Sequence, residues 1–213
     1  MTVDPPTPIL QLHPVHIAFP GEPALLACAS LALLPGLTLL QGDTGSGKTT
    51  LLRALAGELP AGGTQVLDGI DLARAPEAYR RAVFHVDARD AALDPLTSRA
   101  CTASWRAHDP GFDATRWSSA VEGLALGEHL DKRMDMLSTG SRRKVVLAAA
   151  LASGRALVLL DEPTAALDKP SVRWLWQALA GHARPGVRQA VVLASSLPVD
   201  GLPLAATLTL PLR

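Results

Sequence analysis

Residues 42–49 read Gly42-Asp43-Thr44-Gly45-Ser46-Gly47-Lys48-Thr49, which matches the pattern G-x-x-x-x-G-K-[ST] at every fixed position. The apolar residues 37–40 before this stretch predict a buried strand, and the composition of residues 49–55 after it predicts a helix. A strand, a glycine-rich turn and a helix in this order are the context in which the pattern forms a phosphate-binding loop. We therefore expect an α/β domain that binds the phosphates of a nucleotide.

Each residue type in this loop has a chemical reason. The glycines let backbone N–H groups turn toward phosphates, and the N-terminus of the helix adds a partial positive charge. We expect Lys48 to reach the β- and γ-phosphates and the Thr49 hydroxyl to bind Mg²⁺. Thr50, the next residue of the predicted helix, is expected to belong to the same binding site.

A second group of polar residues follows the apolar residues 156–160, which predict a strand buried on both faces. Asp161 and Glu162 come at the carboxyl end of this strand, the edge where ligands bind in open α/β sheets. Asp161 is expected to hold Mg²⁺, directly or through a water. Glu162 is expected to accept a proton from the water that attacks the γ-phosphate.

The rest of the chain alternates between extended and helical segments, which is typical of an α/β fold. Further strands are expected over residues 9–19, 25–34, 64–67, 82–86, 189–194 and 206–210, and further helices over residues 141–151 and 171–180. The interrupted helical pattern from about 96 to 136 predicts a helical lobe, inserted at about residues 90–150. The predicted architecture is one domain over residues 1–213, with a mostly parallel sheet and an N-terminal antiparallel part.

Charge and hydropathy restrict the partners. Twenty Lys and Arg balance 20 Asp and Glu, so no large positive field favours nucleic acid. Charged residues are 19% of the chain, below the roughly 25% of an average soluble domain, and hydrophobic residues are 48%. Either a partner interface or simple enrichment in alanine and leucine explains this surplus. The apolar run at residues 24–40 is interrupted by Ser30 and Pro35 and is too short to span a bilayer.

Three further segments carry a family resemblance. The segment Leu137-Ser138-Thr139-Gly140-Ser141 resembles the L-S-G-G-Q signature of ABC ATPases, with a threonine and a serine where the pattern has its first glycine and its glutamine. Residues 162–168, which end at Asp168, look like the E-P-T-x-x-L-D stretch of the same family. Phe19 is similar to the aromatic residue that stacks on adenine.

The resemblance implies the ABC ATPase fold, a P-loop NTPase core, with ATP and Mg²⁺ as its ligands. It also implies a head-to-tail dimer, with a second copy or with another ABC ATPase, in which each ATP lies between the phosphate loop of one chain and the signature of the other. Ser138 and Gly140 would then contact the partner's nucleotide, and Phe19 and Asp168 would complete the ATP site. An integral membrane permease is the implied partner, at the inner, cytoplasmic face of the cell membrane.

Two positions depart from the family pattern. The glutamine that ends the strand before the helical lobe is absent, and Asp87 stands there. Two interpretations stay open: Asp87 binds the metal or the attacking water, or it is a solvated strand end. The histidine after the strand at 189–194 is also absent, and Ser195 and Ser196 take its place. Ser196 can bond a phosphate oxygen but cannot carry positive charge, and losing one such contact costs about 10²- to 10³-fold in rate.

These residues predict the ATP-binding subunit of an ABC transporter, which hydrolyses MgATP slowly and drives a separate permease. Lys48, Glu162 and Ser196 are its expected catalytic residues. Two alternatives remain. One is a nucleotide-gated interaction module with little hydrolysis of its own. Its signature segment would complete the ATP site of a partner that is competent in hydrolysis. The other is a soluble ABC ATPase that acts on DNA or ribosomes, which the balanced charge disfavours.

Overall fold

The structure is a computed structural model that describes residues 7–17, 26–28, 30–181 and 188–210. The described residues fall into two compact units. The second unit consists of Val86–Arg155 and Glu162–Gly181, and the remaining described residues form the first. The chain therefore passes between the units at each end of the segment 156–161, which includes the predicted metal ligand Asp161.

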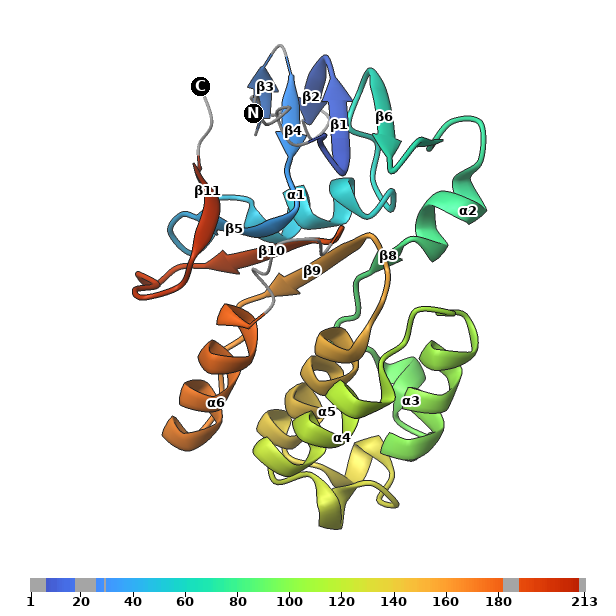
Figure 1. The fold of residues 1–213 in the computed structure, drawn as a ribbon, viewed down its shortest axis with the longest axis vertical. Coiled ribbons are helices and arrows are strands. Elements are labelled where there is room, and N and C mark those ends of the chain that lie inside the picture. The colour runs from blue at the N-terminus through green and yellow to red at the C-terminus, as the bar shows by residue number, and fades with distance from the viewer. Residues whose placement is uncertain (1–6, 18–25, 29, 182–187, 211–213) are drawn as a thin grey trace, which may run out of the picture. The chain divides into compact units, whose positions relative to one another are not determined.

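The first unit contains a five-stranded parallel sheet (Figure 1). Its strands follow the order β11 (Leu204–Thr209), β5 (Gly36–Gln41), β10 (Ala190–Ser195), β9 (Leu157–Asp161) and β8 (Val83–Phe84). Every neighbouring pair runs parallel. Because parallel strands share the edge at which they end, Gln41, Asp161 and Ser195 come to the same edge of the sheet. The register pairs Ser195 with Gln41, the residue before the glycine-rich loop.

The N-terminal part of the chain forms the antiparallel structure that the sequence predicts. One sheet has the order β4 (Leu31–Leu33), β1 (Leu10–His13), β6 (Thr64–Leu67) and β7 (Ile70–Asp71), and β2 (Val15–Ile17) pairs with β3 (Leu26–Cys28). The single strand expected over residues 9–19 is wrong, because Pro14 separates β1 from β2. Proline has no N–H to donate, so it interrupts a ladder.

Helix α1 (Lys48–Leu55) begins directly after the glycine-rich loop. Its apolar face is formed by Leu51, Leu52 and Leu55, which are fully buried in the core of the first unit. The short helix α2 (Pro76–Arg81) was not expected from the sequence, and its Tyr79 is also fully buried. The Tyr79 hydroxyl donates to the Leu55 carbonyl over 2.8 Å, so α2 holds the end of α1 in place.

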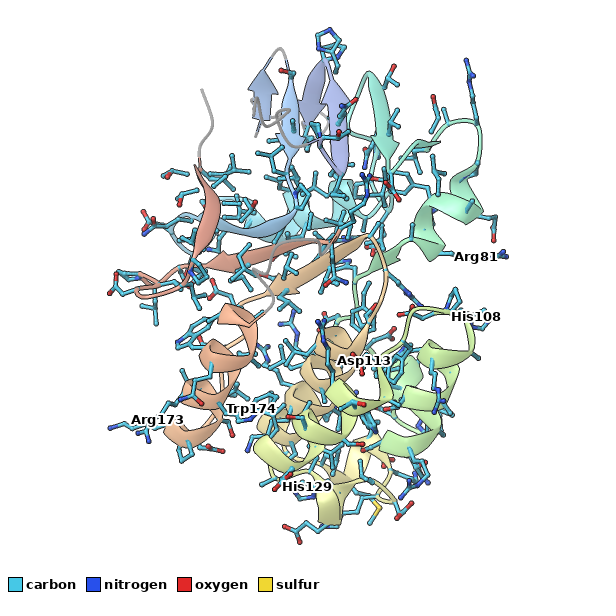
Figure 2. The ribbon with its side chains drawn as sticks, viewed as in Figure 1. Arg81, His108, Asp113, His129, Arg173 and Trp174 are labelled. Carbon is cyan, nitrogen blue, oxygen red and sulfur yellow. The ribbon has the colours of Figure 1, made fainter. Side chains whose placement is uncertain are left out.

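The second unit contains the helices α3 (Ser98–Ala107), α4 (Ala114–Gly123), α5 (Thr139–Ala152) and α6 (Lys169–Ala180), with single turns η1 (Ala91–Leu93), η2 (Gly127–His129) and η3 (Met134–Met136). Residues 96–136, all of them described, contain no strand, and one isolated bridge joins Thr97 to Arg133. Figure 2 shows Trp174 of α6 directed toward α4 and Arg173 directed the opposite way. The indole fills the space beside Gly123, where a Cβ would collide with it.

The α5 segment after residue 144 is buried along its whole length, from Val145 to Ala152. The polar start of the same helix, Thr139 to Lys144, is less buried and carries the signature residues. None of the helices within the described ranges is both long and apolar enough to cross a membrane.

Candidate active site

The glycine-rich loop joins β5 to α1 with a backbone that only glycine adopts easily. Gly45 and Gly47 have φ angles of +83° and +95°, in the left-handed region. Gly47 is also the N-cap of α1, which has no side-chain cap and no acidic residue in its first turn. A helix start without a side-chain cap presents its backbone N–H groups and the positive end of its dipole to an anion. The loop and the start of α1 thus offer backbone N–H groups at which an anion can bind.

Lys48 is the first residue of α1, and its side chain folds back over the loop. The residue is 6% exposed, and its Nζ donates to the Gly42 carbonyl over 2.8 Å and to the Asp43 carbonyl over 3.0 Å. These contacts hold the ammonium group against the backbone of the loop. A phosphate bound by the loop would meet this charge at close range.

Thr49 and Asp161 are 112 residues apart in sequence and meet in the first unit. Thr49 Oγ1 donates to Asp161 Oδ2 over 2.6 Å. The other carboxylate oxygen, Asp161 Oδ1, is buried without a hydrogen-bond partner among the described residues, and so is Ser46 Oγ of the loop. A buried carboxylate oxygen needs a partner, and oxygen donors are those that Mg²⁺ prefers. The residues present therefore fit a Mg²⁺ ion.

A magnesium site needs few protein side chains. Among the residues that the structure describes, no group of three His, Cys, Asp or Glu side chains could hold a metal. Mg²⁺ is commonly bound through one or two protein oxygens together with phosphates and waters. One carboxylate and one hydroxyl beside a phosphate loop are enough for such a site.

Glu162 directly follows Asp161 and belongs to the second unit. Its φ angle is +44°, an unusual value for a residue with a side chain. Its carbonyl accepts a hydrogen bond from Arg143 Nη1 of helix α5. Arg143 was not among the residues expected at the site. The only signal for it in the sequence is its place in the basic run after the signature.

The signature residues form the N-terminus of α5. Ser138 is the N-cap, and its Oγ accepts from the Ser141 backbone N–H over 3.1 Å. A Cβ on Gly140 would collide with the carbonyl of Ala166, in the segment 162–168. The absence of a side chain at residue 140 thus lets the signature helix lie directly on the segment that follows Glu162.

Asp168, the last residue of that segment, is held from two helices. Its Oδ2 accepts from Lys144 Nζ over 2.6 Å, and its Oδ1 accepts from the Ser171 backbone N–H over 2.8 Å, which caps α6. The Lys144 bond, followed by the bonds from Ser171, holds the pKa of Asp168 well below its usual range. Within the second unit, Ser138, Gly140, Glu162 and Asp168 are therefore brought together around the start of α5.

Asp87 is paired with a neighbouring arginine. Its Oδ1 accepts from Arg89 Nε over 3.2 Å and from the Arg89 backbone N–H over 2.9 Å, and its Oδ2 accepts from Arg89 Nη2 over 3.2 Å. Partial burial is the largest single influence on the Asp87 pKa and raises it. The Arg89 bonds and the charge of Arg143 together outweigh burial and lower the pKa. Asp87 adds a negative charge where the family pattern has a neutral glutamine, and Arg89 and Arg143 compensate for this charge locally.

The two serines in the histidine position have different surroundings. Ser195 ends β10 and is buried, and its Oγ donates to the Leu197 carbonyl over 2.8 Å and accepts from the Leu197 N–H over 3.1 Å. Ser196 is half-buried and follows at the same edge of the sheet. Phe19, the expected adenine contact, lies outside the described residues.

Several known proteins are similar to this chain. A family model described as "ABC transporter" matches residues 30–165. The tylosin resistance ATP-binding protein TlrC of Streptomyces fradiae is 39% identical over 212 residues, which are 83% of this chain and only 38% of TlrC. The cytochrome c biogenesis ATP-binding export protein CcmA of Alkalilimnicola ehrlichii is 34% identical over 201 residues, 92% of this chain and 84% of CcmA.

A solved structure of the ATP-binding subunit of an ABC transporter is similar in fold, with a TM-score of 0.76. The sequence identity is 19%, and the match covers 89% of this chain and 80% of the other. At this identity the likeness shows the fold alone. It confirms the α/β architecture with a parallel sheet and an antiparallel part that the sequence predicts.

Proposed function

Because this chain belongs to the ABC transporter family, we propose that it is an ATP-binding subunit that hydrolyses MgATP to drive a separate membrane permease. The observation that carries the proposal is the hydrogen bond of 2.6 Å between Thr49 and Asp161. It joins the helix that follows the phosphate loop to the carboxyl end of β9. A nucleotide on the loop would thus have its phosphates beside a carboxylate whose other oxygen, Oδ1, is buried and has no hydrogen-bond partner among the described residues.

Different residues bind the nucleotide and carry out its hydrolysis. The loop N–H groups and Lys48 hold the β- and γ-phosphates. Thr49 and Asp161 hold Mg²⁺, which supplies Lewis-acid polarisation of the phosphate oxygens when bound. Glu162 accepts a proton from the attacking water. Arg143 supports this step indirectly, because its bond to the Glu162 carbonyl fixes the backbone that carries the carboxylate.

The second unit supplies the other half of a composite site. We propose that two chains pair head to tail, so that Ser138, Gly140 and the N-terminus of α5 face the nucleotide on the partner's loop. Ser138 and Thr139 are exposed, as this role requires. Asp168 and Phe19 are proposed to complete the site, and Asp87 to approach the metal or the attacking water.

A membrane position follows from the proposed permease. The curated relative CcmA, most of whose length this chain covers, is named as an ATP-binding export protein. By analogy, we place this chain at the inner face of the cell membrane, bound to an integral membrane partner. Nucleic acid is not a proposed partner, because the basic and acidic residues balance at 20 each.

A second function is favoured by one observation. Ser195, which stands beside Ser196 in the histidine position, is buried and bonded to its own turn, and neither serine side chain can carry a positive charge. Loss of one polar contact to the transition state costs about 10²- to 10³-fold in rate. The chain would then act mainly as a nucleotide-gated module, with slow turnover of its own.

Steady-state ATPase activity of the purified chain, compared with Glu162→Gln, tests the proposal. Turnover that needs Mg²⁺ and is abolished in Glu162→Gln, with ATP binding retained, supports an ATPase. Equal phosphate release from both proteins, with ATP still bound, contradicts an ATPase and supports the nucleotide-gated module. Affinity purification from solubilised membranes provides a separate test. Recovery of no integral membrane protein contradicts the transporter assignment.

A further inference from the structure

A row of polar contacts runs from Lys132 to the signature serine Ser138. Lys132 Nζ lies 3.4 Å from His129 Nδ1, and His129 Nε2 lies 3.5 Å from Ser141 Oγ. Ser138 Oγ in turn donates to Ser141 Oγ over 3.0 Å. His129 ends η2, and Figure 2 labels it in the segment between α4 and α5. Its side chain is 21% exposed, so the ring is mostly enclosed by the second unit.

The donor and acceptor chemistry of these groups restricts the direction of each hydrogen bond. A lysine ammonium can only donate, so His129 Nδ1 must accept in this contact. The proton of the neutral ring then lies on Nε2, which faces Ser141. Ser141 Oγ accepts from that N–H. Because a hydroxyl both donates and accepts, the bond between the two serines can reverse, so that Ser141 Oγ donates to Ser138 Oγ.

Reversal of this bond frees the hydroxyl donor of Ser138. One lone pair of its Oγ accepts the Ser141 backbone N–H over 3.1 Å, and the other would accept the Ser141 hydroxyl. The hydroxyl hydrogen of Ser138 then points outward, at the exposed start of α5. In the arrangement of the structure, in which Ser138 donates to Ser141, that outward donor is absent. The Nε2–H of His129 occupies one lone pair of Ser141 Oγ and so favours the reversed bond.

We propose that His129 is a positioning residue, which acts through Ser141 to direct the Ser138 hydroxyl toward a phosphate oxygen. The inference rests on the proposed function, in which that oxygen belongs to the γ-phosphate on the paired chain. We call the chain of hydrogen bonds from His129 through Ser141 to Ser138 the relay. It depends on the serine that stands in place of the signature glutamine, because a hydroxyl can accept one hydrogen bond and donate another.

The charged groups around His129 are Lys132 and Glu128. Glu128 Oε1 lies 4.0 Å from His129 Nε2, and Glu128 Oε2 lies 3.8 Å from Lys132 Nζ. Lys132 is therefore held between the imidazole and a carboxylate. This pairing keeps a donor beside Nδ1, which is what the proposed tautomer needs.

Steady-state kinetics of the full chain distinguish the relay from a contact that only stabilises the fold. His129→Leu is expected to lower kcat/KM for MgATP about tenfold, the size of a weakened hydrogen bond to a charged group. His129→Gln keeps an N–H donor near the Nε2 position and should restore most of that loss. Thermal unfolding of each variant serves as the control for folding. No loss in His129→Leu, or an equal loss in His129→Gln, overturns the proposal.

A double-mutant cycle with Ser141 gives a sharper test. Ser141→Ala breaks the row, so His129→Leu should cause no further loss of kcat/KM in that background. A histidine that only supports the fold would lower kcat/KM equally in both backgrounds, and that additivity contradicts the relay. Ser141→Thr keeps the hydroxyl and should remain sensitive to His129→Leu.

One readout does not depend on ATP hydrolysis. The ¹⁵N chemical shifts of the His129 ring at pH 8 distinguish a proton on Nε2 from a proton on Nδ1. We expect the Nε2–H tautomer in the wild-type chain and a mixture in Lys132→Met. A proton on Nδ1 in the wild type overturns the relay. A wild-type chain that fails to hydrolyse ATP overturns the proposed function. The tautomer of His129 then still supports or contradicts the relay, because it is measured without ATP hydrolysis.

Discussion

Lys144 Nζ lies 2.6 Å from Asp168 Oδ2, and this contact joins the signature helix α5 to the N-cap of α6. The other oxygen of Asp168 caps α6 through the Ser171 N–H. One carboxylate thus fixes the end of the segment 162–168 to two helices of the second unit, α5 and α6. The first residue of this segment is Glu162, so the contact bears on the placement of the proposed catalytic base.

Removing the Asp168 carboxylate is expected to destabilise the chain. Asp168→Ala should lower the free energy of unfolding at pH 7 by about 1 kcal/mol, the usual cost of losing an N-cap. Asp168→Asn should cost less, because asparagine caps a helix as well and only the Lys144 bond is lost. Urea unfolding followed by circular dichroism measures both differences. A larger loss in Asp168→Asn than in Asp168→Ala contradicts the assigned cap.

The lowered pKa of Asp168 also predicts a pH dependence. A carboxyl whose pKa is lower in the folded state stabilises the fold above its unfolded pKa, near 4, and loses this contribution as the pH falls toward the folded pKa. The stability gap between the wild type and Asp168→Asn should therefore be full at pH 6 and shrink below about pH 4. Unfolding free energies measured from pH 7 to pH 3 test this. A gap that stays constant over the range contradicts it.

Gly140 should tolerate no side chain. A Cβ at this position would collide with the Ala166 carbonyl, so Gly140→Ala must push the signature helix away from the segment 162–168. We expect a loss of roughly 1 to 3 kcal/mol in unfolding free energy, typical of overpacking, together with reduced ATP turnover. Thr139→Ala, at the exposed neighbouring residue, is the matched control and should change stability by less than about 0.5 kcal/mol. Equal effects of the two substitutions would refute the close approach.

The basic run at residues 142–144 marks the limit of what the sequence could predict. In sequence it is an ordinary basic helix start. In the structure each residue has its own distant partner: Arg142 binds Asp94, Arg143 binds the Glu162 carbonyl, and Lys144 binds Asp168. Composition and local pattern carry no information about partners 19 to 48 residues away, so these contacts could not be predicted.

The loop at residues 42–49 is the opposite case. Its glycines at positive φ, the buried strand before it and the helix after it are local properties, and each follows from the residues themselves. The strand that ends at Asp161 was equally clear, because it is a continuous apolar run. Missed elements, such as α2, are short and owe their conformation to tertiary contacts like that of Tyr79 with Leu55.

Thr49 should be required for magnesium as much as for the nucleotide. Thr49→Ala removes the hydroxyl that holds Asp161 Oδ2, and we expect the apparent Mg²⁺ affinity in the ATPase assay to fall about 10- to 100-fold. Thr49→Ser keeps the hydroxyl and should stay near the wild type. Magnesium titrations at saturating ATP give the two values. Unchanged Mg²⁺ dependence in Thr49→Ala would remove Thr49 from the metal site.

Ser196→His should raise ATP turnover, because it restores a side chain that can carry positive charge next to the γ-phosphate. The gain can reach about 10²- to 10³-fold, the value of one polar contact to the transition state. Ser195→His is the matched control, since Ser195 is buried and bonded to Leu197, and a histidine there should destabilise the fold without any gain. Adding Glu162→Gln to Ser196→His should abolish the new activity. If Ser196→His leaves kcat unchanged, the missing histidine does not limit hydrolysis.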